Sequence, residues 1–290
     1  MGSTLRKHLL IFLLAPLLGA CSMGQMVART SVSIIDGATE AMNSETDLVL
    51  AEAAIPANIK LVEGLIVEDP GNPVLLATAA QGLYGYAFGF TELKNRNRAE
   101  ALYQRGAEYG FRALRSFGVD IDLRRANIDA IDKAVSRLGH NAVPALFWTA
   151  SCWAKQIDLN RTDPARLAEL GSTERLMQRI LQLEPDYFAG SVYGYYGVYY
   201  GSRAPMFGGD FSLAEKNFSA ARAVTEGRLL IFDVLQAEYL ERQRLDQTQF
   251  HHLLESVINT PVGIFPEMAL INQISRARAR YLLGLEEEWF

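Results

Sequence analysis

The sequence predicts an all-α fold, built as an irregular stack of paired helices. Apolar residues recur three or four positions apart along most of the chain, which is the spacing of one helix face. No segment shows the sustained alternation of apolar and polar residues that a half-buried strand needs. Two distant segments each begin with an acid-Pro turn and then continue alike, which indicates an internal repeat.

The helices follow from the chain in order. A first helix is expected over residues 46–66, with a kink or a junction of two helices at Pro56. Residues 74–90 and 143–157 are apolar on nearly all sides, so both are predicted to be buried helices. Turn-forming clusters separate these from the other expected helices, at residues 96–117, 122–138, 173–183, 213–225, 229–243, 248–259 and 265–285, with a short helix from Pro164 and a tyrosine-rich helix ending at Gly201.

The internal repeat is clearest at two prolines, Pro70 and Pro185. Each follows an acidic residue and precedes an aromatic-rich helix. In both copies a Gly lies twelve residues after the Pro and a Tyr fourteen residues after it; the pairs are Gly82 with Tyr84, and Gly197 with Tyr199. Small residues beside aromatic ones predict helices that approach closely and fill the space between them.

A second pattern places an aromatic residue four positions after an Ala, and a small residue three positions further on. It occurs as Ala214-Phe218-Ala221 and, more loosely, as Ala99-Tyr103-Gly106. This is the second-helix half of a tetratricopeptide repeat, although no regular period is visible. We therefore predict an irregular tetratricopeptide-like helical-repeat stack over residues 44–290, with about four helix pairs and a C-terminal capping helix.

The N-terminus has the pattern of a bacterial lipoprotein signal. Arg6 and Lys7 precede an apolar run over residues 9–18, too short for a permanent membrane span, and a small pair leads directly to Cys21. We predict a signal peptide over residues 1–20, lipidation of Cys21 and a tether over residues 21–43. The alternative is an ordinary secretory signal with a chance cysteine. Ser22, in place of an inner-membrane retention Asp, favours a periplasmic domain anchored to the outer membrane.

Composition and motifs argue against several functional classes. A net charge of −5 does not suit a nucleic-acid partner, and 49% hydrophobic residues suit a packed core. The sequence has no phosphate-binding loop, dinucleotide fingerprint or paired cysteine ligands, and Ser191 lacks the flanking residues of a nucleophile elbow. His251 and His252 are too few to form a metal site. We predict a non-enzymatic protein without cofactor or metal.

The most distinctive stretch is residues 183–211, where five tyrosines lie within eight positions of one helix. They cover more than one helix face, so some are packing residues, while others can line a groove or channel. Arg203 follows in a loop, where it either clamps a carboxylate or interacts with the helix C-terminus. Trp148 and Trp153 point to different sides of their helix, so at most one faces a cavity. The candidate lining comprises Tyr84, Phe88, Trp148, Tyr195, Tyr196, Tyr199 and Arg203.

Several segments occur in an informative order after the lipoprotein signal. They are PANIKLVEGLIVEDPGNPVLLATAAQGLYGYAFGF, RAEALYQRGAEYGFRAL, VPALFWTASCWAKQI, GGDFSLAEKNFSAARAV and RARARYLLGLEEEWF. In that order, and from about residue 44 to the end, the chain resembles the TatT family, the T component associated with tripartite ATP-independent periplasmic (TRAP) transporters.

This resemblance implies a tetratricopeptide-like periplasmic lipoprotein that partners the solute-binding protein of such a transporter. It further implies a homo-trimer with a channel through each subunit for a hydrophobic or carboxylated ligand. The residues alone leave a second function open, that of a general periplasmic adaptor in envelope protein assembly. A channel lined by the tyrosine helix and Arg203 would favour the transport role, and a filled core would favour the adaptor.

Overall fold

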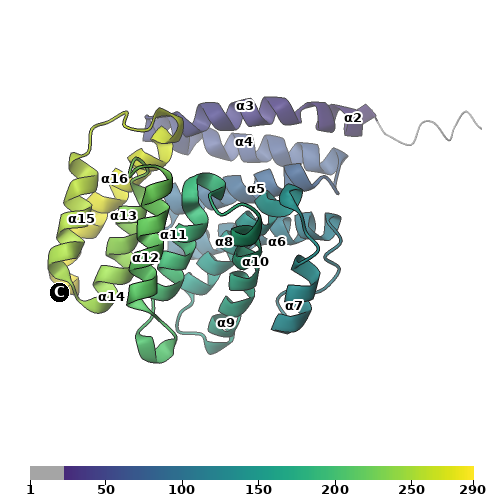
Figure 1. The fold of residues 1–290 in the computed structure, drawn as a ribbon. Coiled ribbons are helices and arrows are strands. Elements are labelled where there is room, and N and C mark those ends of the chain that lie inside the picture. The colour runs from purple at the N-terminus through teal and green to yellow at the C-terminus, as the bar shows by residue number, and fades with distance from the viewer. Residues whose placement is uncertain (1–22) are drawn as a thin grey trace, which may run out of the picture.

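The computed structural model describes residues 23–290, and every regular element in that range is a helix (Figure 1). The first half of the chain forms α2 (Met23–Thr30), α3 (Val32–Asn43), α4 (Leu48–Glu68), α5 (Pro73–Tyr86), the π-helical turn η2 (Ala87–Thr91), α6 (Arg96–Ser116), α7 (Ile128–Val135), η3 (His140–Ala142) and α8 (Val143–Leu159). The second half forms α9 (Pro164–Ala168), α10 (Leu170–Leu183), α11 (Tyr187–Gly201), η4 (Pro205–Phe207), α12 (Phe211–Val224), α13 (Ile231–Gln236), the π-helical turn η5 (Ala237–Glu241), α14 (Arg242–Arg244), α15 (Gln247–Asn259), η6 (Pro266–Met268), α16 (Ala269–Leu283) and α17 (Glu286–Trp289).

Successive helices pack as pairs, which confirms the predicted fold class. The pairs are α5 with α6, α8 with α10, α11 with α12, and the continuous α13–η5–α14 segment with α15, followed by α16. The two Ala-aromatic-small patterns lie in second helices of pairs, as the repeat predicts. Ala214, Phe218 and Ala221 on α12 are all fully buried, and so are Ala99 and Tyr103 on α6.

Glycines set the close approach of the paired helices. A Cβ atom built on Gly197 of α11 would lie 2.7 Å from ring atoms of Phe218, and one on Gly106 of α6 would lie 2.6 Å from the sulfur of Cys152. Neither position has room for a larger residue unless the neighbour moves. The small positions predicted from the sequence are therefore the points where one helix seats against the next.

The stack curves until its two ends meet. The C-terminal helix α16 packs against α3 and α4, which are separated from it by most of the chain. In Figure 1 the yellow C-terminal helices accordingly lie beside one end of the purple N-terminal pair. Because the ends meet, the curved stack has an inner surface lined by helices from both halves of the chain. Partly open cavities lie along this inner surface.

The structure differs from the sequence prediction in residues 23–43. They form α2, which packs against α4, and α3, which packs against α16, where we expected a tether. Ala28 and Ile35 are buried, and Arg29 Nε donates to Asp69 Oδ2 at 3.0 Å. The apolar spacing of Ile35 and Met42 is helical but is diluted by polar neighbours. The predicted signal peptide, Cys21 and its lipidation lie outside the described residues.

Of the two alternatives expected at Pro56, the junction of two helices is wrong: α4 runs through the proline as one helix and buries residues on both sides of it. The start of α7 also differs from the prediction. α7 begins only at Ile128, because the side chain of Asn127 accepts from the backbone N–H of Ala130 and so caps the helix there. The preceding residues, 122–127, form turns, where the sequence predicted one helix over 122–138.

Candidate functional site

The curved stack holds a partly open cavity of about 870 Å³ between α8, α9, α11 and the α13–η5 segment. This volume falls within the roughly 300–1,000 Å³ typical of small-molecule sites. Aromatic and aliphatic side chains dominate the lining. The aromatic ones are Tyr84, Phe88, Phe147, Trp148, Phe188, Tyr195, Tyr199, Phe207, Phe232 and Tyr239. Such a lining suits a ligand with a large apolar part.

Six of the seven predicted lining residues face this cavity. They are Tyr84, Phe88, Trp148, Tyr195, Tyr199 and Arg203. The Tyr84 ring stacks on Phe88, with the ring centroids 6.0 Å apart, and lies 5.5 Å from the Trp148 ring. Trp153 is fully buried instead and donates from its indole N–H to Glu169, so only one of the two tryptophans reaches the cavity, as predicted.

Tyr196 is the predicted lining residue that the structure places elsewhere. One position along a helix rotates a side chain by about 100°, so Tyr196 points away from the face that carries Tyr195. Its ring is buried, and its hydroxyl donates to Glu174 Oε1 on α10 at 3.0 Å. Tyr196 is therefore a packing residue between helices, which is the alternative that the sequence left open for the tyrosines.

Tyr195 and Tyr199 stack one helical turn apart, with their ring centroids 5.9 Å apart, on the face of α11 that lines the cavity. The Tyr195 hydroxyl is 2.8 Å from Thr173 Oγ1, and burial raises the pKa of Tyr195 well above its usual range. Tyr195 therefore stays neutral. It offers the cavity an apolar ring, and its polar tip is already bonded.

Arg203 interacts with the C-terminus of α11, which is one of the two roles that the sequence left open. Its Nε and Nη2 donate to the backbone carbonyl of Tyr199, at 3.2 and 2.9 Å, and so satisfy the end of α11. Its guanidinium carbon lies 4.4 Å from the centroid of the Tyr199 ring, and the side chain also lines the cavity. Carboxylate binding by Arg203 stays a prediction.

The start of α11 carries backbone strain at the cavity wall. Phe188, Ala189 and Gly190 all have positive φ angles, of 48°, 56° and 83°. A left-handed conformation costs a non-glycine residue about 1 kcal/mol or more. It turns the Phe188 ring against Trp148, with the ring centroids 5.0 Å apart. The ring thereby forms a wall between the large cavity and a second one.

The second cavity, of about 220 Å³, lies between α3, α4, α5 and α16. It shares Tyr84, Phe88, Trp148, Phe188, Met268 and Ile271 with the large cavity. Ile35 and Met42 of α3 line it as well, so the segment expected to be a tether contributes to the inner surface. One layer of side chains thus separates two apolar cavities.

A third cavity, of about 890 Å³, is similar in volume to the large apolar cavity and adjoins its polar side. It lies between η2, α6, the end of α8, η5 and α16, and we call it the polar vestibule. Its lining is rich in charged side chains: Glu92, Lys94, Arg96, Asp158, Arg161, Glu238, Arg242 and Arg278. It shares Asp158, Arg161, Tyr239 and Gln243 with the large cavity, so these residues form the wall between the two.

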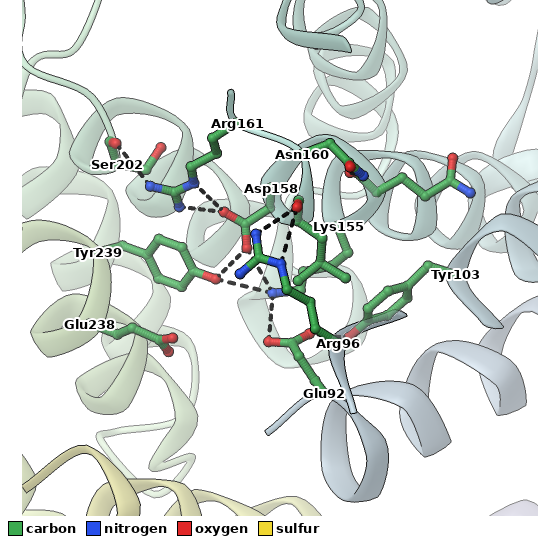
Figure 2. Close-up of polar contacts among 12 residues, drawn as sticks. Glu92, Arg96, Tyr103, Lys155, Asp158, Asn160, Arg161, Ser202, Glu238 and Tyr239 are labelled. Atoms are coloured by element: carbon green, nitrogen blue, oxygen red, sulfur yellow. Dashed lines mark hydrogen bonds and ion pairs between the residues drawn. The ribbon is translucent and has the colours of Figure 1, made fainter. Parts of the chain in front are cut away.

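A cluster of buried ion pairs, centred on Lys155, builds that wall (Figure 2). Lys155 Nζ lies 2.9 Å from Glu92 Oε1, 2.9 Å from Asp158 Oδ2 and 3.1 Å from the hydroxyl of Tyr239. The Tyr239 hydroxyl donates to Asp158 Oδ2 at 2.7 Å. Lys155 has 11% of its side chain exposed and Glu92 6%, so these charges interact with little solvent screening.

Two arginines complete the Lys155 cluster. Arg161 pairs with Asp158, and Arg278 donates to Glu92 Oε1 at 2.9 Å and to Glu238 Oε1 at 2.8 Å. The members are the cations Lys155, Arg161 and Arg278 and the carboxylates Glu92, Asp158 and Glu238. Three positive and three negative charges make the cluster neutral as a whole. Only a network balanced in this way is tolerated at such burial.

The environment holds Asp158, Lys155 and Glu92 in their charged forms. Burial alone raises the pKa of Asp158, but Lys155 and Arg161 outweigh it and hold that pKa well below its usual range. Burial likewise lowers the pKa of Lys155, and the carboxylates of Asp158 and Glu92 outweigh it, so that pKa lies well above its usual value. The pKa of Glu92 is lowered by Lys155 and Arg278 against the opposing effect of burial.

The two π-helical turns position two of the three carboxylates of the cluster, Glu92 and Glu238. Glu92 directly follows η2, where its backbone N–H donates to the carbonyl of Ala87 at 2.8 Å, and Glu238 lies within η5. A π-helical turn inserts one extra residue into a helix and is often found at functional sites. Here both turns face the same cavity wall.

Sequence reasoning missed this cluster. One signal was present, because Lys155 is the only charged residue in the otherwise apolar segment 143–157. A lone charge on a helix that is buried on all sides requires buried partners. Asp158 lies only three positions further on, but nothing in the sequence shows that Glu92 and Tyr239 are partners too, since they lie 63 and 84 positions away along the chain.

Two further observations bear on function. No helix within residues 23–290 combines the length and the apolar character needed to cross a membrane. In the same part of the chain, no group of three or more His, Cys, Asp or Glu side chains is arranged to hold a metal ion.

Comparison with known proteins identifies the family to which the chain belongs. The chain is 22% identical over 268 residues to an uncharacterized protein of Treponema pallidum (strain Nichols), covering 87% of this chain and 83% of that protein. Residues 44–290 match the sequence profile of the family described as TAtT, the TRAP transporter T-component. That match spans most of the chain and the whole of the helix-pair stack, and the protein therefore belongs to the TRAP transporter T-component family.

Proposed function

We propose that this T-component is a non-enzymatic periplasmic lipoprotein that binds the solute-binding protein of a TRAP transporter and takes up that protein's ligand in its internal cavities. The observation that carries the proposal is the row of three cavities, each sharing a wall with the next. A stack built only to present an outer surface to protein partners has no need of an apolar interior space of about 870 Å³.

The proposed ligand route runs from the cavity behind α3, through the large cavity, to the polar vestibule. Its inner part is lined by rings, so hydrocarbon is stabilised there at about 25 cal/mol per Å² of apolar surface removed from water. The walls at Phe188 and at the Lys155 cluster close the route at two points. Passage of a ligand would require side chains to move at each wall.

The location of the protein is part of the proposal. Lipid attached at Cys21 would hold the domain at the periplasmic face of the outer membrane, and the helices from Met23 onward would begin directly after the anchor. Cys21→Ala is expected to move the protein from the membrane fraction to the soluble periplasmic fraction. Fractionation by centrifugation measures this, and continued membrane association would reject the anchor.

The homo-trimer implied by the family resemblance is tested separately by mass measurement in solution.

The partner is tested by capture from intact cells. Crosslinking of a tagged chain followed by purification should recover a periplasmic solute-binding protein, identified by mass spectrometry. The control is an unrelated lipoprotein with the same tag and the same signal segment. Equal recovery of solute-binding proteins with both baits would remove the support for the partnership.

The cavity is tested by filling it. Ala154 of α8 lines the large cavity and is half-buried, so Ala154→Trp places an indole in the ligand space. We expect this variant to bind the apolar dye N-phenyl-1-naphthylamine at least about tenfold more weakly than the unchanged protein, a loss of about 1.4 kcal/mol. Fluorescence titration measures the affinity, and thermal unfolding checks the fold.

Ala101→Trp is the matched control, because Ala101 is exposed on α6 and does not line the cavity. Its dye affinity should equal that of the unchanged protein. If Ala154→Trp also leaves the affinity unchanged, the dye binds elsewhere and the cavity is not the ligand site.

A further inference from the structure

The helices α2 and α3 expose an apolar stripe at the surface. Its largest side chains are Met23, Val27 and Ile34, and each is more than half exposed. Ser31 joins the two helices with right-handed helical backbone angles, and its N–H donates to the carbonyl of Val27 at 3.0 Å, so α2 and α3 continue as one. At about 100° per residue, the three apolar side chains fall within about 40° of one another.

The charged side chains of α2 and α3 lie on a different side. Arg29, Asp36 and Glu40 are rotated by about 200–240° from Ile34 in the same helical geometry. The side that packs on the core is a third one, because the buried Ile35 is rotated by about 100° from Ile34. A helix on the surface of a domain needs one apolar side, for the core. α2 and α3 carry a second apolar side, and the domain itself does not cover it.

This apolar surface continues onto α4 around the mouth of the second cavity. Ile34 and Ala38 of α3 and Leu61 of α4 line that cavity and are also exposed at the surface. Leu50, also exposed, lies eleven positions before Leu61 and so within about 20° of it on α4. In Figure 1, α2 and α3 run alongside α4 on one face of the molecule. We call this surface the N-terminal apolar face, and it comprises Met23, Val27, Ile34, Ala38, Leu50 and Leu61.

The position of the predicted lipid decides what covers the N-terminal apolar face. Exposed apolar surface of this kind marks contact with a membrane or with another protein. Cys21 precedes Met23 by only two residues, which span at most about 7 Å. The expected tether over residues 21–43 would have let the domain turn freely, but those residues from Met23 onward are folded into α2 and α3. The lipid would therefore hold this face beside the bilayer.

We propose that the N-terminal apolar face lies on the bilayer that carries the lipid anchor, with its side chains at the boundary between head groups and acyl chains. This inference rests on the proposed anchor at Cys21 and adds the orientation of the domain on the membrane. Helical surfaces that lie on a membrane reach about 5–10 Å into that boundary. The mouth of the second cavity, beside Ile34 and Leu61, then opens onto lipid.

The charges around the face specify how it contacts the bilayer. Lys60 and Glu68, which have opposite signs, border it on α4, and Arg29 is outnumbered by Asp36 and Glu40 on α2 and α3. The contact therefore depends on apolar area removed from water and not on attraction to anionic lipid. The face orients a domain that the lipid already holds, and it does not replace the lipid.

The test uses the lipidated full chain in vesicles of phosphatidylcholine, with and without phosphatidylglycerol. Val27→Cys, Ile34→Cys and Leu61→Cys each receive the fluorophore NBD; the native Cys152 is buried and should not react. Nitroxide groups on the lipid acyl chains should lower the fluorescence of each label at least about twofold, because they lie at the depth that the face should reach. Phosphatidylglycerol should make no difference.

Asp36→Cys and Leu245→Cys are the matched controls. Asp36 is exposed on the charged side of α3, and Leu245 is exposed directly after α14, away from α2 and α3 (Figure 1). Labels at these two positions should be quenched by iodide in the water and not by the lipid nitroxide. Thermal unfolding checks that every labelled variant folds.

Ile34→Glu tests whether the contact depends on the apolar side chains. A carboxylate at the apolar boundary is unfavourable, so the quenching of the label at position 61 by lipid nitroxide should fall at least about twofold. Ser33→Glu is the matched control, because it adds the same charge to an exposed position on the side that carries Glu40, seven residues further on. It should leave the quenching unchanged.

The outcomes separate this inference from the anchor. If the protein floats with vesicles in a density gradient but lipid nitroxide quenches none of the labels, the anchor stands and the face does not lie on the membrane. If the protein does not float, both proposals fail. If the labels at positions 27 and 34 are shielded from iodide and yet not reached by lipid nitroxide, a second copy of the chain or another protein covers the face, and the membrane proposal is wrong.

Discussion

Lys155→Met is expected to lower the free energy of unfolding by about 3–5 kcal/mol, because it removes one partner from a buried ion-pair network and leaves the others uncompensated. Glu92 and Asp158 would keep their charges with only Arg278 and Arg161 opposite them. Methionine keeps the length of the side chain and its apolar stem, so the loss reports the charge and not a cavity. Chemical denaturation, with the free energy extrapolated to water, measures the change.

The decrease in the free energy of unfolding caused by Lys155→Met should depend on pH in a defined way. The folded-state pKa values of Asp158 and Glu92 are lowered, so their contribution to stability is present above their unfolded values, near 4, and disappears as pH falls through the folded values. The pKa of Lys155 is raised, so its contribution is present below its unfolded value, near 10, and disappears as pH rises through the folded value. The full difference between the two proteins is therefore expected from about pH 4 to 10, and it should shrink in more acidic solution.

Lys60→Met is the matched control on the surface. Lys60 pairs with Glu63 at 2.9 Å, but its side chain is 69% exposed, and exposed pairs contribute about 0–1 kcal/mol. If Lys155→Met costs no more than Lys60→Met at neutral pH, solvent or local rearrangement compensates the cluster, and the wall at the vestibule is not a rigid one.

The helix pairs could be predicted from the sequence because their signals are local. Ala214, Phe218 and Ala221 lie within about two turns of one helix. The spacing of small and large side chains there predicts where the neighbouring helix packs against it. Tyr195 and Tyr199 could be assigned to one face by the same periodicity, and both line the cavity. Tyr196 could not be separated from them on residue type alone, since only its position relative to α10 assigns it to packing.

Features that depend on the closing of the stack had no local signal. The packing of α16 on α3 and α4 joins segments more than 200 positions apart, and it is this closure that turns an inner surface into cavities. The Lys155 cluster depends on it too, because Arg278 reaches Glu92 across 186 positions. The sequence predicts a tether over residues 21–43 for a related reason. The partners of its apolar residues Ile35 and Met42 lie on other helices, including α4 and α16, and are not visible in the local pattern.

Phe218→Ala is expected to lower the free energy of unfolding by about 3–5 kcal/mol, the usual cost of truncating a fully buried aromatic side chain.

Combining Phe218→Ala with Gly197→Ala tests whether the two residues set the distance between α11 and α12. In the unchanged protein a Cβ on Gly197 meets the Phe218 ring at 2.7 Å, so Gly197→Ala should cost about 1–3 kcal/mol by overpacking. In the Phe218→Ala background the ring is gone, and the same substitution should be neutral or should stabilise the helix by about 0.5–1 kcal/mol.

Gly64→Ala is the control, because Gly64 is exposed on α4 with nothing within 4 Å of the added Cβ, and it should be mildly stabilising in both backgrounds. The coupling matters for the site, since Gly197 lies between Tyr195 and Tyr199 on α11, and the distance from α11 to α12 fixes where those rings stand in the cavity. Additive effects of the two substitutions would mean that the glycine does not set that distance.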